Sequence, residues 1–316
     1  MKNPETVIIN LPARRATKDV APRWFDWPFC QAYRKATLSS GSSPYLLVDV
    51  IKEIVQSRSK VILLVFNPSV FTILTALLIP PALLEVHSLY QWIWTRNRRL
   101  HYLGILYILK RSSRVYLYDR NTETKLASKS WLKQKLLRYP IYTDTDFFRY
   151  REPQNTVEGL GSIILVVGDH KRDDSILNEV ASMLPEMQVI RISKHLNNIA
   201  PVKNLKVLTS VPYEELQLLY RNSAACMVIT TETGFPVGIT ALAEAIACGC
   251  AVVATKGAGT GFFKETSCTR FVEVGATADE IVDQLRSAMR CQEDQRKRSN
   301  LKWLSGEECV RVLTTK

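Results

Sequence analysis

Short apolar runs alternate with helical patterns through the second half of this 316-residue chain. Six runs have the length and continuous apolar character of buried strands: residues 162–168, 188–193, 205–210, 226–231, 251–255 and 270–274. Four other segments carry apolar residues at helical spacing: residues 173–184, 212–224, 238–249 and 278–290. Strands that are apolar on both faces must be covered on both faces, so the pattern predicts βαβ units and a parallel sheet. Ligands of such sheets bind beyond the carboxyl ends of the strands.

The first half shows the same alternation less clearly. Strand-like runs occur at residues 6–11, 60–66, 81–87 and 114–119, and helical patterns near residues 44–58, 68–78, 88–110 and 121–137. A chain of this length is too long for one core. We therefore expect an α/β fold with two Rossmann-like parallel-sheet domains facing across a cleft, residues 1–150 and 151–295. Residues 296–316 would form a C-terminal helix that packs back on the first domain, and residues 143–161 the linker.

The excess positive charge is confined to the first half. The chain carries a net charge of +12, with 23 Lys and Arg against 10 Asp and Glu in residues 1–150 and 19 against 20 in the rest. Such asymmetry predicts that the first half faces an anionic partner. Residues 87–114 mix aromatic and basic side chains, which suits a membrane interface with anionic lipid. The alternative is a solvated basic face, and nucleic acid is not expected because no recognised nucleic-acid module occurs.

No segment has the pattern of a membrane span, a signal peptide or a metal site. The most apolar stretch, residues 61–86, is interrupted by Asn67-Pro68 and Pro80-Pro81. We read it as strand, helix and strand in a buried sheet, with some membrane contact as the alternative. The apolar run near the N-terminus is too short for a signal peptide. The seven cysteines include no C-x-x-C pair, and most lie in apolar stretches, which is typical of reduced core residues in the cytoplasm.

The segment GITALAEAIACG, residues 238–249, places a single acid in a helix that is otherwise small and apolar. Gly238, Ile239 and Thr240 offer the free N–H groups of the first turn, which together with the helix dipole favour a phosphate. Glu244 lies one turn further on, on the same face as Thr240. It is badly placed there for a phosphate but well placed for two sugar hydroxyls, so the helix predicts a nucleotide site. The alternative is a Glu244 side chain that points at solvent.

The stretch around this helix resembles a known enzyme family. Residues 204–255 contain VPYEELQLLY, a strand, a glycine-containing loop and AEAIACGCAVVA. This order is similar to the nucleotide-sugar segment of GT-B fold glycosyltransferases, especially the retaining family-four enzymes, and the likeness covers much of residues 160–290. The resemblance implies a hexosyltransferase-type enzyme that moves a sugar from a nucleotide-diphosphate sugar, with retention and without a metal or other cofactor.

The resemblance also implies roles for residues of the donor site. Glu244 matches the family acid that binds the donor ribose. Lys171 and Arg172 fall where the family has basic residues on the diphosphate, and two cations there would stabilise the leaving group. A solvated loop is the alternative reading of these two cations. Ser210 and Val211, at the end of a strand, match the contacts to the nucleotide base through backbone groups.

The candidate catalytic residues follow the family pattern only in part. His87 in EVHS matches a family histidine that faces the transferred sugar, although a structural histidine at a strand end is an equal alternative. The family pairs two glutamates eight positions apart, but Pro236 occupies the first position, so Glu232 is the candidate substitute. Asp169 stands where the family has an arginine. These departures leave open a second hypothesis, a GT-B-like partner subunit that binds nucleotide or sugar without turnover.

The main hypothesis is therefore a cytoplasmic glycosyltransferase that takes part in polysaccharide or glycolipid biosynthesis. The basic first half would bind a lipid-linked acceptor or a growing glycan and would lie on the inner face of a membrane. The second half would hold the nucleotide-sugar donor.

Overall fold

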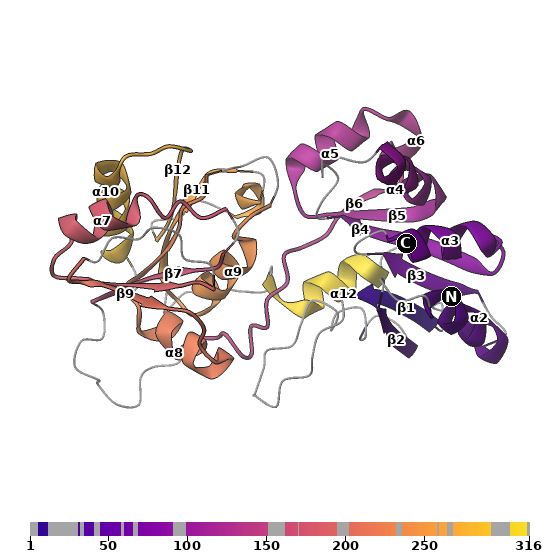
Figure 1. Cartoon of the computed structure of the whole chain (residues 1–316), viewed down its shortest axis with the longest axis horizontal. Helices are drawn as coiled ribbons and strands as arrows, with labels where there is room; N and C mark the ends of the chain where they lie inside the picture. The colour runs from indigo at the N-terminus through magenta and orange to yellow at the C-terminus, as the bar shows by residue number, and fades with distance from the viewer. Residues whose placement is uncertain are drawn as a thin grey trace. The chain divides into compact units, whose positions relative to one another are not determined.

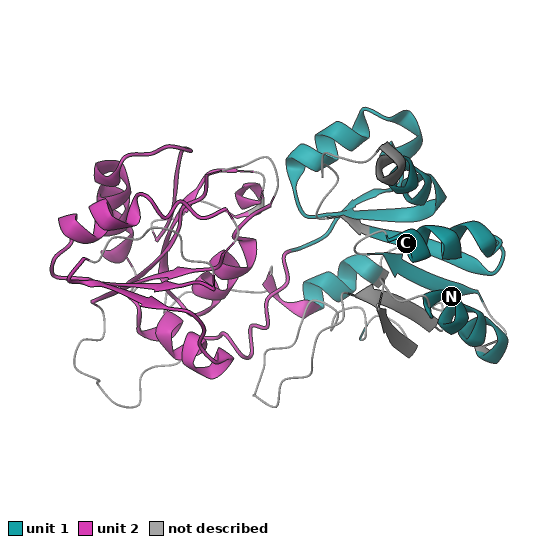
Figure 2. Ribbon diagram, in the orientation of Figure 1, with its two compact units in different colours: residues 1–16, 25–140, 307–316 teal, residues 17–24, 141–306 magenta. Residues whose placement is uncertain are grey.

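The computed structural model describes residues 6–11, 31, 35–40, 45–57, 60–65, 69–90, 99–150, 162–169, 171–194, 202–231, 236–257, 259–263, 268–291 and 304–314. The chain divides into two compact units, which Figures 1 and 2 show. Unit 1 comprises residues 1–16, 25–140 and 307–316, and unit 2 comprises residues 17–24 and 141–306. Each unit contains one six-stranded sheet. The cleft between two domains stays a prediction.

The division falls at residue 140, ten residues before the boundary expected from the sequence. Residues 141–150 group with unit 2 because helix α8 (Tyr213–Asn222) binds them through its side chains. The Arg221 guanidinium donates to the carbonyl of Phe147 at 3.0 Å and to that of Arg149 at 2.9 Å. The Tyr150 N–H donates to the carbonyl of Ala247 at 3.1 Å.

The sheet of unit 2 is parallel throughout, and all six predicted strands are present. Its order is β12 (Thr269–Val272), β11 (Ala251–Thr255), β10 (Ala225–Val228), β7 (Ile163–Val167), β8 (Gln188–Ile192) and β9 (Leu205–Leu208). From β7 the chain builds outward through β8 and β9, then returns to β10 on the other side of β7 and builds outward again. The strand order therefore reverses between β7 and β10, and such switch points are where open α/β sheets bind ligands.

The predicted helices of unit 2 are also present. Helices α7 (Leu177–Met183) and α10 (Ala278–Met289) pack together and share a core with alternate residues of the strands. The other strand face is equally apolar and buried, as at Leu165, Cys226 and Val252, and α8 and α9 (Ile239–Ala247) pack on β7, β10 and β11. A 3-10 helix, η1 (Thr260–Phe262), precedes β12.

The sheet of unit 1 is also parallel and contains two strands that the sequence did not reveal. Its order is β2 (Lys35–Ser40), β1 (Thr6–Leu11), β3 (Val61–Val65), β4 (Leu84–Tyr90), β5 (Ser112–Leu117) and β6 (Leu136–Arg138). The unexpected strands are β2, which has few apolar residues, and the three-residue β6, whose residues are only half-buried or exposed. The helix expected over residues 121–137 is instead α5 (Arg120–Ala127) and α6 (Ser130–Lys133), followed by β6.

Three helices pack side by side on one face of this sheet: α2 (Leu46–Ser57), α3 (Val70–Leu78) and α4 (Arg99–Arg111). They share a core with β3 and β4. The C-terminal helix α12 (Gly306–Thr314) contacts this unit through the Arg114 guanidinium, which donates to the carbonyl of Leu313 at 3.3 Å. Among the described residues, no helix combines the length and the apolar character needed to cross a bilayer.

Candidate functional site

Two loops are joined at the switch point of the unit 2 sheet. One follows β7 and the other follows β10, the two neighbouring strands at which the strand order reverses. The Thr231 N–H donates to the carbonyl of Lys171 at 3.0 Å, and the Asp173 N–H donates to the carbonyl of Ile229 at 3.1 Å. This antiparallel pairing fixes the loop after β7 against the loop that leads into helix α9.

The Arg172 guanidinium lies where these loops meet the start of α9. Its Nε and Nη2 atoms donate to the carbonyl of Val167, at 2.9 and 2.8 Å. Gly168 and Gly238 have positive φ angles. A Cβ atom on Gly168 would lie 2.8 Å from Nη2 of Arg172, and a Cβ atom on Gly238 would lie 3.1 Å from Nη1. The two glycines therefore allow this close approach, and Arg172 connects the end of β7 with the N-terminus of α9. Burial lowers the pKa of Arg172 from its ordinary value, with the charge of Arg191 as the next cause.

Helix α9 begins without a side-chain cap, because its N-cap residue is Gly238. The N–H groups of the first turn have no partner within a helix, and they form the positive end of the helix dipole. A cation such as Arg172 beside that end is electrostatically unfavourable unless an anion lies between them. The arrangement therefore favours binding of a phosphate or diphosphate.

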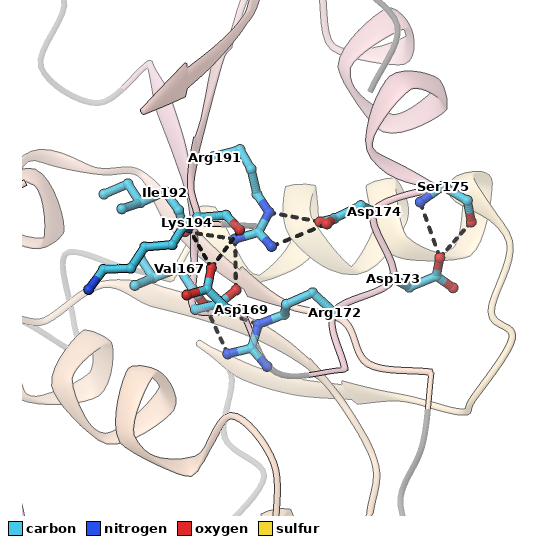
Figure 3. A network of polar contacts seen from close by, with 11 residues as sticks. Val167, Asp169, Arg172, Asp173, Asp174, Ser175, Arg191, Ile192 and Lys194 are labelled. Carbon is cyan, nitrogen blue, oxygen red and sulfur yellow. Dashed lines mark hydrogen bonds and ion pairs between the residues drawn. The ribbon is translucent and has the colours of Figure 1, made fainter. Parts of the chain in front are cut away.

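A buried arginine from β8 supports the loop after β7 (Figure 3). Arg191 is completely buried, and its Nε and Nη2 atoms lie 2.7 and 3.3 Å from the two carboxylate oxygens of Asp174. Its Nη1 atom donates to the carbonyls of Gly168 and Ile192, at 2.8 and 2.7 Å. Arg191 thus holds the first glycine of the loop and an acid six residues later. Sequence reasoning missed this pair, and the one signal was a lone arginine inside the apolar run QVIRIS.

Asp169 and Lys171 complete the loop. The Ser193 hydroxyl and the Lys194 N–H donate to Asp169 Oδ1 at 2.5 and 2.8 Å, which ties the end of β7 to the end of β8. The acid that replaces the arginine of the family pattern therefore has a structural partner. Lys171 is exposed and has a φ of 52°, in the left-handed region. Of the two predicted cations, Arg172 points toward the α9 N-terminus and Lys171 lies on the loop surface.

Glu244 is buried, with 7% of its surface exposed, so the alternative of a solvated carboxylate is wrong. The Tyr220 hydroxyl of α8 donates to its Oε2 atom at 3.1 Å. Burial raises the pKa of the Glu244 carboxyl to about 8, and the hydrogen bond from Tyr220 acts in the opposite direction. Glu244 is therefore mostly protonated at neutral pH in the absence of a ligand. Gly249, with a φ of 74°, ends the helix as predicted.

The other predicted donor-site residues lie at the same edge of the sheet or nearby. Ile239 is half-buried and Thr240 exposed, both in the first turn of α9. Ser210 is exposed and Val211 half-buried, and both follow the edge strand β9. Glu232 lies outside the described residues.

The sequence analysis expected His87 at the end of its strand, but the structure places it within the strand. Strand β4 continues for three residues beyond it because EVHSLY is extended throughout. His87 is 3% exposed, its Nε2 atom lies 2.9 Å from Glu85 Oε1, and its ring meets Tyr116 edge to face at 5.9 Å. Burial lowers the pKa of His87, and the hydrogen bond to His87 is the main reason why the pKa of Glu85 falls to about 2. This geometry favours the structural alternative.

Comparisons with known proteins concern the family of the second half and the fold of the chain. The family model described as Glycosyl transferases group 1 matches residues 188–302, which include α8, α9 and β11. No curated protein sequence gives a match.

Three solved structures are similar over nearly the whole chain. A glycosyltransferase from Rickettsia africae ESF-5 has 11% identity and a TM-score of 0.66, with 100% of both chains covered. Alr3699/HepE from Anabaena, in complex with UDP, has 11% identity and a TM-score of 0.64, with 98% of this chain and 96% of that chain covered. WaaG, a glycosyltransferase involved in lipopolysaccharide biosynthesis, has 11% identity and a TM-score of 0.63, with 98% and 100% covered.

Replacing Glu244 with glutamine tests the buried acid. The folded-state pKa of about 8 exceeds the ordinary 4.5, so the folded protein holds an extra proton between these values. The stability due to this proton is complete below pH 4.5 and is lost as the pH rises through 8. The thermal midpoint of the wild type minus that of Glu244→Gln should therefore decrease as the pH is raised from 5 to 9. A difference that does not change with pH would contradict the raised pKa.

Replacing Arg191 with methionine tests the support of the loop. The change leaves the Asp174 carboxylate and the Gly168 carbonyl without their partner, and breaking a buried pair costs about 3–5 kcal/mol. The surface pair of Lys256 and Glu273, 3.2 Å apart and largely exposed, supplies the control. Lys256→Met should cost less than about 1 kcal/mol. Urea unfolding measures the loss in free energy of unfolding for both variants. Equal losses would contradict the claim that Arg191 supports the loop after β7.

The likeness inferred from the sequence is thus confirmed: residues 188–302 match the group 1 glycosyltransferases, and the fold of the chain is that of GT-B glycosyltransferases.

Proposed function

We propose that this protein is a glycosyltransferase that uses a nucleotide-diphosphate sugar. One observation carries the proposal: the Arg172 guanidinium and the uncapped N-terminus of α9 meet at the switch point, and the same helix bears the buried Glu244. The diphosphate would bind the helix N-terminus, Arg172 and Lys171, and the ribose would bind Glu244. Ser210 and Val211 would contact the base.

The relatives support a nucleotide-sugar donor. The fold alone does not decide an activity. The family match, however, covers the helix that carries Glu244, and two of the similar structures are those of proteins described as glycosyltransferases. The HepE structure contains UDP, so UDP is the first nucleotide to test.

The proposed chemistry needs no metal and no general base. The bond between the anomeric carbon and the diphosphate oxygen breaks, while a bond forms between that carbon and an acceptor hydroxyl. The acceptor's proton passes to the departing diphosphate, and the reaction retains the anomeric configuration. Arg172 and the helix N-terminus would stabilise the charge that develops on the leaving group. Glu232 stays a candidate catalytic residue. His87 is a weaker one, because its imidazole is bound within β4.

The acceptor is proposed to be a lipid-linked sugar or a growing glycan. Unit 1 contains 22 Lys and Arg against 9 Asp and Glu over the sequence assigned to it, so the excess of positive over negative charge belongs to this unit. A cationic unit is attracted to the anionic lipids of a cytoplasmic membrane face. We propose a peripheral position there, in polysaccharide or glycolipid biosynthesis.

A non-catalytic partner subunit is the second candidate function. Pro236, at the position of the first family glutamate, favours it. A Cβ atom on Gly259 would lie 2.9 Å from the Pro236 Cα atom, so the backbone packs closely there. An enzyme would release nucleotide from its donor in the presence of an acceptor. A binding subunit would bind the donor and release nothing with any acceptor.

Binding of UDP and UDP-sugars tests the donor site. A ligand at about 100 times its dissociation constant should raise the thermal midpoint by several degrees. Arg172→Met should weaken UDP binding about tenfold or more, because it removes charge-assisted hydrogen bonds. Lys203→Met, which removes an exposed cation before the amino end of β9, is the control. Equal affinities of the two variants would refute the assignment of Arg172.

A further inference from the structure

Helix α3 turns four of its larger apolar side chains outward, whereas Phe71 and Ile73 are half-buried. The residues it buries are Thr72, Thr75 and Ala76. Its outward residues are between 41% and 67% exposed: Val70, Leu74, Leu77 and Leu78. The buried hydroxyls are satisfied within the helix, since Thr75 Oγ1 donates to the Phe71 carbonyl at 2.7 Å and Thr72 Oγ1 lies 3.0 Å from Ser69 Oγ. The helix therefore has the reverse of the pattern expected for a helix that faces water.

Helix α2 continues this exposed apolar surface. Its outward apolar residues are between 48% and 67% exposed and recur at helical spacing: Val48, Ile51 and Val55. Helices α2 and α3 pack side by side on the same face of the sheet, as Figure 1 shows, so both stripes face away from the sheet. We call these seven residues the α2–α3 face. Exposed apolar patches of this kind mark surfaces that bind a protein or a membrane.

The charges around the α2–α3 face favour an anionic partner. Residues 61–84 contain no charged side chain, so α3 itself is neutral. The Arg111 guanidinium lies at its C-terminal end and donates to the carbonyls of Ile79 and Leu84, both at 3.2 Å. On α2, Lys52 is exposed, Asp49 is half-buried and Glu53 is buried, so the positive charge comes from unit 1 as a whole and not from α2. A second copy of the chain would bring two strongly cationic units together, which like-charge repulsion opposes.

We propose that the α2–α3 face inserts into the interface of a bilayer that contains anionic lipid. The apolar side chains would enter the boundary between headgroups and acyl chains, and Lys52 and the other cations of unit 1 would meet lipid phosphates. The inference rests on the peripheral attachment proposed above and names the surface responsible. It places the contact on α2 and α3 instead of on residues 87–114.

Sedimentation with vesicles tests this surface. The wild-type chain should sediment with phosphatidylcholine vesicles that contain about 30 mol% phosphatidylglycerol, and less so as salt rises. The double variant Leu77→Gln/Leu78→Gln should bind these vesicles at least about tenfold more weakly, because two apolar side chains are no longer transferred from water into the bilayer. Val48→Gln/Val55→Gln should lose binding similarly. Leu218→Gln/Val274→Gln removes two comparably exposed residues from unit 2 and should change nothing.

The outcomes separate this inference from the donor-site proposal. All variants should keep the wild-type thermal midpoint and affinity for UDP, because the changed residues are exposed. If both the α2 and the α3 variants sediment like the wild type, the assignment of the α2–α3 face is wrong, but the proposed attachment to the membrane is not. A wild type that does not sediment at low salt would overturn both. If the wild type forms a dimer without lipid and Leu77→Gln/Leu78→Gln dissociates it, the α2–α3 face binds a second copy of the chain and the membrane proposal is wrong.

Discussion

The ion pair between the buried Arg191 and the half-buried Asp174 is the interaction on which the candidate site depends. Taking two charges out of water costs several kcal/mol, and such a pair is tolerated only when its hydrogen bonds are satisfied. Here the Arg191 guanidinium also binds the carbonyls at the ends of β7 and β8, at 2.8 and 2.7 Å. The pair therefore sets the path of the loop after β7. Arg172 lies on this loop, so its position against Gly168 and Gly238 follows from that path.

The electrostatics of the candidate site are arranged for an anion. Arg172 and the positive end of α9 lie together, and Glu244 does not oppose them because it is mostly neutral near pH 7. Ribose hydroxyls that donate to Glu244 would stabilise its charged form and lower its pKa again. Binding of a nucleotide would then release a proton from Glu244. The same helix would thus hold the diphosphate at its N-terminus and the sugar one turn further on.

The sequence predicted the fold of unit 2 well, because strands that are apolar on both faces and helices with one apolar face leave a clear pattern. It predicted less of unit 1, where β2 and β6 are short or weakly apolar. Spacing alone left the burial of Glu244 open, since burial depends on Tyr220 and α8. The pair of Arg191 and Asp174 joins residues 17 positions apart, and only the tertiary structure brings them together. His87 was misplaced because a strand's end is not readable from EVHS.

The central claim is that Glu244 binds the ribose while the N-terminus of α9 binds the diphosphate. Calorimetric binding of UDP and of 2′-deoxy-UDP to the wild type and to Glu244→Ala tests it most directly. We expect loss of the hydroxyl to weaken binding to the wild type about tenfold, as for a hydrogen bond to a charged group, and to have little effect on the variant. An equal loss of affinity in both proteins would show that the ribose lies elsewhere.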